Sequence, residues 1–207
     1  MLAILEPQHI IQALGLIGVI GIIFAESGLF FGFFLPGDSL LFTAGLFASQ
    51  GYMNVAWLVI GCALAAIIGD NVGYAFGKRM GPALFSREDS FFFHKKHIKR
   101  ASDFYEKYGA KTIVLARFVP IVRTFAPIVA GVGSMRYRTF FFFNIFGGLL
   151  WTLLLTSLGY FLGKAFPGIE DYLHVVIIAI IVVSLIPIAV EWIKAKRAPR
   201  DPGAPAA

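Results

Sequence analysis

Residues 112–135, TIVLARFVPIVRTFAPIVAGVGSM, decide how this chain can fold. The stretch is apolar and long enough to enter a bilayer, but two arginines and two prolines interrupt it, at Arg117, Arg123, Pro120 and Pro127. A proline in a helix interior costs about 3 kcal/mol, which argues against one straight transmembrane helix. Broken helices persist at membrane depth where protein or a water-filled cavity satisfies the freed backbone groups. The stretch therefore predicts a re-entrant helical hairpin over about 111–135, with its tip near 119–127.

The composition indicates that lipid is the main solvent of this chain. Of its 207 residues, 58 % are hydrophobic and 14 % are charged, and the mean hydropathy is +0.78. A soluble globular protein has about a quarter charged residues, so this chain has too little polar surface to cover itself in water. We predict one polytopic, all-α membrane domain over residues 1–197 and a disordered tail over 198–207.

Three apolar runs predict full transmembrane helices, because about 20 helical residues cross a hydrocarbon layer of roughly 30 Å. They cover residues 52–77, 139–162 and 172–193. Between the first two runs, residues 85–108 place apolar side chains at helical spacing, with basic residues on the rest of the helix surface. This pattern predicts an amphipathic helix on the cytoplasmic face, with a solvated linker helix as the alternative for its first half.

A second broken stretch lies near the N-terminus. An apolar run over residues 10–34 leads into Leu35-Pro36-Gly37-Asp38, and a further apolar run continues to about residue 48. Pro36 and Gly37 are helix breakers, so we predict another re-entrant hairpin over about 18–50, with its tip near 36–38.

The distribution of basic residues predicts the orientation of the chain. No Lys or Arg precedes Lys78, and residues 78–111 hold nine basic residues against four acidic ones. A second basic cluster follows the last apolar run, at Lys194, Lys196, Arg197 and Arg200. Basic segments beside transmembrane helices usually face the cytoplasm. We therefore expect a multi-pass protein with a cytoplasmic C-terminus, and no nucleic-acid partner.

An internal repeat relates the two broken stretches at an offset of 86 residues. The segment Gly73-Tyr74-Ala75-Phe76-Gly77-Lys78 matches Gly159-Tyr160-Phe161-Leu162-Gly163-Lys164, and Ala44-Gly45 matches Ala130-Gly131. Each half is then a hairpin followed by a span. Since a hairpin returns to its own side whereas a span crosses, the halves should be inverted repeats, as in many secondary transporters.

Four charged residues fall within the two predicted hairpins, namely Glu26, Asp38, Arg117 and Arg123. A charge at bilayer depth costs about 2.5–3.5 kcal/mol on insertion scales, so each requires an explanation. If the hairpin tips meet, the arginines are predicted to bind an anionic phosphate through bidentate contacts, and the carboxylates to carry protons. Ion pairs that only neutralise one another are the alternative.

Other polar residues are weaker candidates. Asp70 and Asn144 are possible accessory residues; Asp70 suits either local capping or ion coupling, and helix packing is favoured for Asn144 and Trp151. The lone cysteine, Cys62, lies in an apolar run, and no histidine is grouped with a carboxylate in the sequence. We therefore predict no metal site, no cofactor and no catalytic residues.

The residues around the second hairpin resemble a known family. The segment Arg117-Phe118-Val119-Pro120-Ile121-Val122-Arg123, with Pro127, Ala130-Gly131 and Met135, closely resembles the signature of the DedA family of bacterial membrane proteins, whose domain is also called VTT or SNARE-associated. Similar family patterns occur at Glu26 with Pro36-Gly37-Asp38, at Gly69-Asp70-Asn71-Val72-Gly73-Tyr74 with Gly77-Lys78, and at Asn144 with Trp151. The resemblance covers roughly residues 20–165.

The resemblance implies two facing re-entrant hairpins and a role in moving lipid across the bacterial cytoplasmic (inner) membrane. It associates the chain with undecaprenyl phosphate recycling, phospholipid movement and the proton motive force. The family's essential acids and arginines fall on Glu26, Asp38, Arg117 and Arg123, although some members carry Glu in place of Asp38. We therefore predict a proton-coupled flippase for a phosphate-bearing lipid, with undecaprenyl phosphate as the leading candidate. Its partners would be the anionic headgroup, protons and the membrane, and homo-oligomer formation stays open.

Alternatives from other classes remain at this stage. A phospholipid scramblase or a proton-coupled oxyanion transporter would use the same four charges. An enzyme acting on lipid phosphates would need a nucleophile near basic residues, and a scaffold protein would tolerate alanine at all four charged positions.

Overall fold

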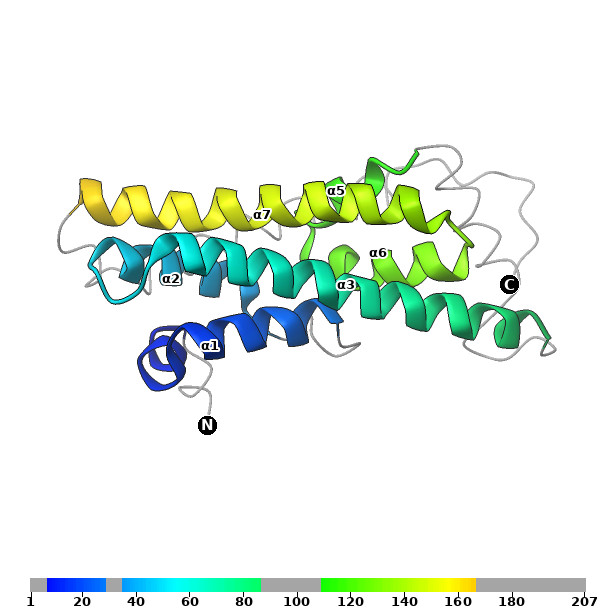
Figure 1. Cartoon of the computed structure of the whole chain (residues 1–207), viewed down its shortest axis with the longest axis horizontal. Helices are drawn as coiled ribbons and strands as arrows, with labels where there is room; N and C mark the ends of the chain where they lie inside the picture. The colour runs from blue at the N-terminus through cyan, green and yellow to red at the C-terminus, as the bar shows by residue number, and fades with distance from the viewer. Residues whose placement is uncertain (1–6, 29–34, 87–108, 167–207) are drawn as a thin grey trace, which may run out of the picture.

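Six α-helices make up the described part of the computed structural model, which comprises residues 7–28, 35–86 and 109–166 (Figure 1). The helices are α1 (Pro7–Gly28), α2 (Gly37–Ser49), α3 (Val55–Ser86), α5 (Thr112–Ala116), α6 (Pro120–Val132) and α7 (Tyr137–Ala165). No strand occurs in these ranges, which confirms the all-helical class for the part described. The predicted amphipathic segment beyond Ser86, the span 172–193 and the tail 198–207 lie outside the described residues.

The two longest helices fall on two of the predicted spans. Within the described ranges, Val55–Met80 of α3 and Tyr137–Ala165 of α7 are long and apolar enough to cross a membrane. Both helices expose apolar side chains, including Trp57, Leu64 and Phe76 on α3 and Phe146, Leu153 and Phe161 on α7. Such faces suit contact with lipid. α3 continues to Ser86 rather than ending at the predicted residue 77, because a change of solvent from lipid to water does not itself end a helix.

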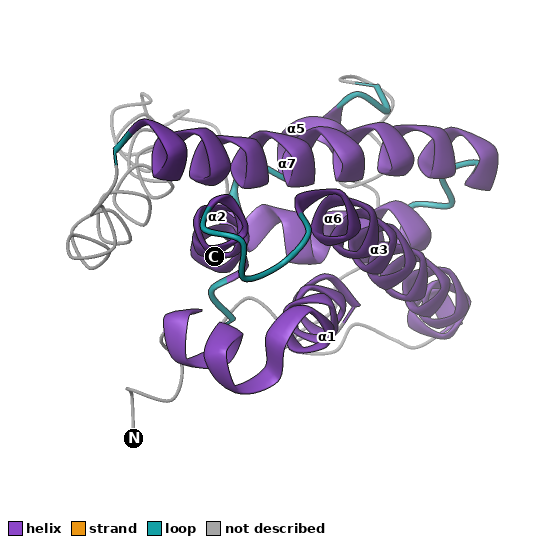
Figure 2. Ribbon diagram, turned by 60° about the vertical axis from the view of Figure 1, so that its left-hand side comes forward, coloured by secondary structure: helices purple, strands orange, loops and turns teal. Residues whose placement is uncertain are grey.

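The shorter helices pack across the two halves of the chain. α2, from the first half, packs along α7 of the second, and α6 packs along α3 of the first. Figure 2 shows α2 and α6 below α7, with α1 on their other side. Every residue of α2 from Ser39 to Ala48 is buried, as expected for a helix that is apolar on all faces.

Glycines at equivalent positions of the 86-residue repeat make equivalent contacts in this crossed packing. A Cβ at Gly159 would collide with the backbone of Phe42, and a Cβ at Gly73 would lie 3.5 Å from the side chain of Ile128. Gly159 and Ile128 are the repeat equivalents of Gly73 and Phe42. The two halves of the chain therefore share one packing arrangement, in which each half supplies the short helix that covers the other half's long helix.

The helix breaks have local causes. Val119 is extended, with φ −119° and ψ 106°, because the ring of a following proline disfavours helical backbone; α6 then begins at Pro120. At the other break, Pro36 precedes α2, and its carbonyl accepts hydrogen bonds from Leu40 N at 2.8 Å and Ser39 Oγ at 3.0 Å. Pro36, Gly37 and Pro120 thus stand at helix starts, as their predicted role requires.

The predicted role of Pro127 as a helix breaker is wrong. Pro127 does not break the second stretch, because it lies inside α6, where its ring packs at 3.5 Å from the position of a Cβ on Gly73. A proline inside a helix removes one backbone hydrogen bond and can kink the helix without ending it. α1 starts at Pro7, and its backbone is interrupted at Gly15, close to the predicted start of the first stretch near residue 18; the φ of 57° and ψ of −154° at Gly15 are nearly restricted to glycine.

The crossed packing predicts that Gly159→Ala destabilises the protein. The new methyl group would meet the backbone of Phe42, and such overpacking costs about 1–3 kcal/mol. We expect a melting temperature several degrees lower for the purified protein in detergent. Gly21→Ala is the matched control, since no atom lies within 4 Å of a Cβ there. Equal melting temperatures for the two variants would contradict the crossed packing.

Candidate functional site

Arg123 lies between two carboxylates from the first half of the chain. Its Nη2 donates to Glu26 Oε1 near the end of α1, and its Nη1 donates to Asp38 Oδ1 in the first turn of α2. Glu26 is only 1 % exposed. With Trp151, these residues form what we call the Arg123 cluster. The two broken stretches of the chain thus meet at their charged residues, and one arginine binds both acids.

The backbone around the Arg123 cluster is shaped to bring the acids together. Glu26 packs against Gly37, and a Cβ on residue 37 would overlap the Glu26 carboxylate. Only glycine leaves room for that carboxylate at the start of α2. Asp38 lies in the first helical turn, where the helix dipole favours a negative charge.

Trp151 of α7 contacts both members of the Arg123–Asp38 pair. Its Nε1 donates a hydrogen bond to Asp38 Oδ1 at 2.9 Å, and the Arg123 guanidinium carbon lies 5.0 Å from the ring centroid. A guanidinium at this distance from an indole ring is attracted by its π-system. Trp151 therefore orients both the Asp38 carboxylate and the Arg123 guanidinium. The predicted packing role describes only part of what this residue does.

Arg117 belongs to a separate group of residues, the Arg117 cluster. Its Nη2 donates both to Asp70 Oδ2 on α3 and to Asn144 Oδ1 on α7. Asn144 is held in turn, since its Nδ2 donates to the carbonyl of Ile67 at 3.0 Å. Neither Glu26 nor Asp38 pairs with Arg117, so Asp70 acts as its counter-ion rather than as a local cap.

Two adjacent glycines on α7 make room for Arg117. A Cβ at Gly147 would lie 3.1 Å from Arg117 Cδ, and one at Gly148 would lie 3.5 Å from Arg117 Nη2. In the sequence, the pair Gly147-Gly148 lies between Asn144 and Trp151. Two adjacent glycines there indicate that a large side chain from another helix crosses this face of α7.

The two clusters differ in access. The side chains of Arg123 and Asp38 are 12 % and 18 % exposed, whereas those of Arg117 and Asp70 are 4 % and 6 % exposed. In the part of the chain that the structure describes, Glu26 Oε2 and Arg123 Nε are buried with no hydrogen-bond partner. In the same part of the chain, Arg117 Nε is likewise buried without a partner, so the Arg123 cluster is set apart by its partial exposure rather than by its unpaired atoms. Among the described residues, no three His, Cys, Asp or Glu side chains are grouped as metal ligands.

Removing the counter-ion of Arg117 should be strongly destabilising. Asp70→Asn would leave a buried guanidinium without a charged partner, which costs about 3–5 kcal/mol. The double variant Asp70→Asn/Arg117→Gln removes both charges and should recover a large part of this loss. Chemical unfolding of wild type, Asp70→Asn, Arg117→Gln and the double variant in detergent gives the coupling energy between the two residues. Additive effects of the two single substitutions would exclude the pairing.

Comparisons with known proteins agree with the residue patterns. The VTT domain family matches residues 35–161. The chain is 51 % identical over 179 residues to the protein DedA of Escherichia coli K12, covering 86 % of this chain and 81 % of that protein. It is 44 % identical over 206 residues to an uncharacterised membrane protein of Mycobacterium tuberculosis, covering 96 % and 90 % of the two chains.

A more distant relative is the inner membrane protein YqjA of E. coli K12, with 35 % identity over 167 residues, 80 % of this chain and 76 % of YqjA. No solved structure matches the chain. The family match extends over more than half of the sequence, and both E. coli relatives are matched over most of their length. The chain is therefore a membrane protein of the DedA family, with a VTT domain over residues 35–161.

Proposed function

We propose that this protein moves a phosphate-bearing lipid, with undecaprenyl phosphate as the leading candidate, across the bacterial cytoplasmic membrane and that this movement is coupled to protons. The observation that carries the proposal is the position of Arg123, which is shared by Glu26 and Asp38 at the junction of the two broken stretches. A guanidinium held by two carboxylates can exchange them for the oxygens of a phosphate, because both groups match its fork of N–H donors.

The charge balance explains why protons would be required. The two clusters contain three acids and two arginines, so their net charge is −1 when all five groups are ionised. A phosphate that enters this environment adds further negative charge, which is costly away from water. Proton uptake by Glu26 and Asp38 would offset the added charge and release Arg123 to the ligand. The headgroup and the protons would then occupy the site together.

The two arginines have unequal roles in this proposal. Arg123 makes the first contact with the phosphate, since its cluster is partly exposed. Arg117, held by Asp70 and Asn144, supplies a second positive charge behind it and joins the ligand only after a rearrangement. The hydrocarbon part of the lipid would remain outside the two charged clusters, in contact with the membrane. An apolar groove of about 550 Å³ along α7, lined by Leu150, Leu154 and Phe161 among others, supports this arrangement.

The proposal predicts that Arg123 tolerates neither alanine nor lysine. Arg123→Ala should reduce translocation of undecaprenyl phosphate in proteoliposomes about 10- to 100-fold, the range for losing charge-assisted hydrogen bonds. Arg123→Lys keeps the charge but loses the bidentate geometry, so a reduction of about tenfold is expected. Lys111→Gln, which removes an exposed positive charge, is the control. Full activity of Arg123→Ala would refute the role of this residue.

Glu26→Gln tests the proton coupling separately. This variant cannot release a proton at position 26, so its translocation should no longer respond to an imposed pH gradient, whereas that of wild type should. Ordinary phospholipids and free oxyanions are assayed in parallel. Equal movement of all phospholipids without a gradient would favour a scramblase, and uptake of a free oxyanion would favour an ion transporter.

Trp151→Phe tests the positioning of the Arg123 cluster. Phenylalanine keeps an aromatic ring beside Arg123 but lacks the Nε1–H that Asp38 accepts. Loss of one hydrogen bond to a charged group corresponds to about 1.5–3 kcal/mol, so translocation should fall at least about tenfold. The dependence on lipid concentration separates this effect from unfolding, and an unchanged rate would show that Trp151 serves packing alone.

A further inference from the structure

A further group of cationic and aromatic residues lies in the C-terminal half of α3 and at the start of α7. A cavity of about 510 Å³ is lined by Asn71, Tyr74, Ala75, Lys78, Arg79 and Tyr137, and we call it the interfacial pocket. Lys78 follows Asp70 by eight residues, or about 12 Å of helix rise, whereas Asn71, at the other end of the pocket, directly follows Asp70 of the Arg117 cluster. Among the described residues, no acidic side chain lines the pocket.

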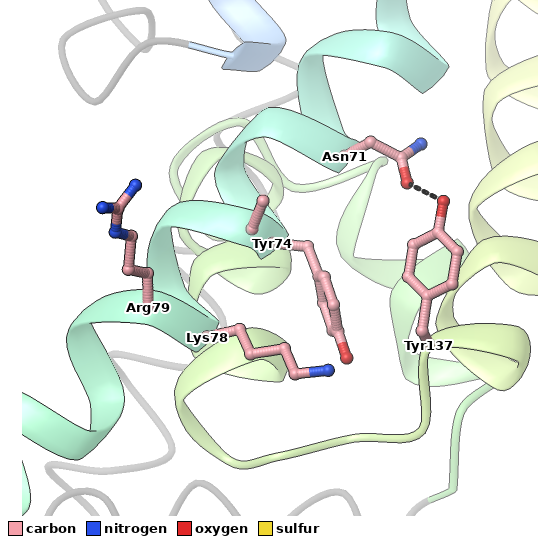
Figure 3. A pocket seen from close by; sticks show the side chains of 6 residues that line it. Asn71, Tyr74, Lys78, Arg79 and Tyr137 are labelled. Atoms are coloured by element: carbon pink, nitrogen blue, oxygen red, sulfur yellow. Dashed lines mark hydrogen bonds between the residues drawn. The ribbon is translucent and has the colours of Figure 1, made fainter.

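The aromatic walls of the pocket are held in place by hydrogen bonds. Tyr137 Oη donates to Asn71 Oδ1 at 3.0 Å, and Tyr74 Oη donates to the carbonyl of Met135. Tyr74 also stacks on Phe140, with ring centroids 4.4 Å apart. Figure 3 shows Lys78 extending toward the hydroxyl end of Tyr74, with Tyr137 beside them and Arg79 directed away. The pocket is therefore a fixed aromatic frame around one ammonium group.

The positive charge of Lys78 is not used within the described part of the chain. Lys78 and Arg79 are both exposed, and neither forms an ion pair with another described residue. The repeat provides a contrast, since the equivalent lysine, Lys164, lies 4.8 Å from the ring centroid of Tyr160. In the first half the equivalent ring, Tyr74, stacks on Phe140 instead. Within the described ranges, the ammonium of Lys78 is thus available to an anion.

The position along α3 suits a ligand at the membrane surface. About 20 residues of helix cross the hydrocarbon layer, so a span that begins near Val55 reaches the interface close to Tyr74. Tyrosine and lysine are typical of this level. Val72 and Phe76, which are 45 % and 53 % exposed, lie on the same part of α3 and offer an apolar surface to acyl chains.

We infer that the interfacial pocket binds a phosphate group at the membrane surface, presented by the headgroup of an anionic glycerophospholipid. Lys78 supplies the charge, while Tyr137, Tyr74 and Asn71 shape the cavity around the phosphate. This site is distinct from the Arg123 cluster, and its occupancy does not depend on lipid transport. A lipid bound here would contact α3 and the start of α7, the long helices of the two halves.

The test uses the full chain in phosphatidylcholine nanodiscs that contain a small fraction of spin-labelled phosphatidylglycerol. Electron spin resonance reports the immobilised fraction of labelled lipid for wild type, Lys78→Gln and Lys78→Arg. We expect the preference for phosphatidylglycerol to fall about fivefold in Lys78→Gln, as for loss of one basic charge at a membrane surface, and to persist in Lys78→Arg. Lys164→Gln, the repeat-equivalent control, should retain it.

Competition with millimolar inorganic phosphate distinguishes the two sources of the anion. Immobilisation that resists inorganic phosphate supports a lipid headgroup, whereas displacement that depends on Lys78 identifies free phosphate as the ligand of the same pocket. An equal preference in wild type and Lys78→Gln would overturn the inference. So would an equal loss in Lys78→Gln and Lys164→Gln, because it would reflect surface charge in general. Melting temperatures confirm that the compared proteins are folded.

Discussion

In a membrane, a buried charge has to find its partner within the protein, and the junction of Arg123 with Glu26 and Asp38 follows from that constraint. The three residues come from α6, α1 and α2, so a single guanidinium joins three helices from both halves of the chain. Gly37 is required there because the Glu26 carboxylate occupies the space of a side chain. The crossed packing of α2 on α7 and α6 on α3 brings these helix ends together.

α7 connects the two charged clusters. Asn144 and Trp151 lie two turns apart on this helix, one bound to Arg117 and the other to Asp38. Between them, Gly147 and Gly148 leave space for the Arg117 side chain. A shift or rotation of α7 would therefore change the contacts of both clusters at once. Under the proposed function, movement of this helix would couple the two clusters when a ligand binds.

Features with a local chemical cause could be predicted from the sequence. Buried charges, helix breaks at Pro36 and Pro120 and the 86-residue repeat are all visible in residue order, and helices occur where the long apolar runs predicted them. The choice of partner could not be predicted, because it depends on how helices distant in sequence pack. For Asp70 the sequence leaves local capping and ion coupling open, whereas in the structure this residue lies within α3 and pairs with Arg117. The position of Pro127 inside α6 could not be predicted either, because a proline can kink a helix without ending it.

The crossed packing also determines the order in which the molecule can be completed during synthesis. α2 is buried on all sides, yet α7, along which it packs, starts almost 90 residues later in the chain. At about 5–20 residues per second, a ribosome takes several seconds to produce that partner. During this interval Glu26 and Asp38 also lack Arg123. The first half can therefore complete its packing and its charge pairing only after the second half has been made.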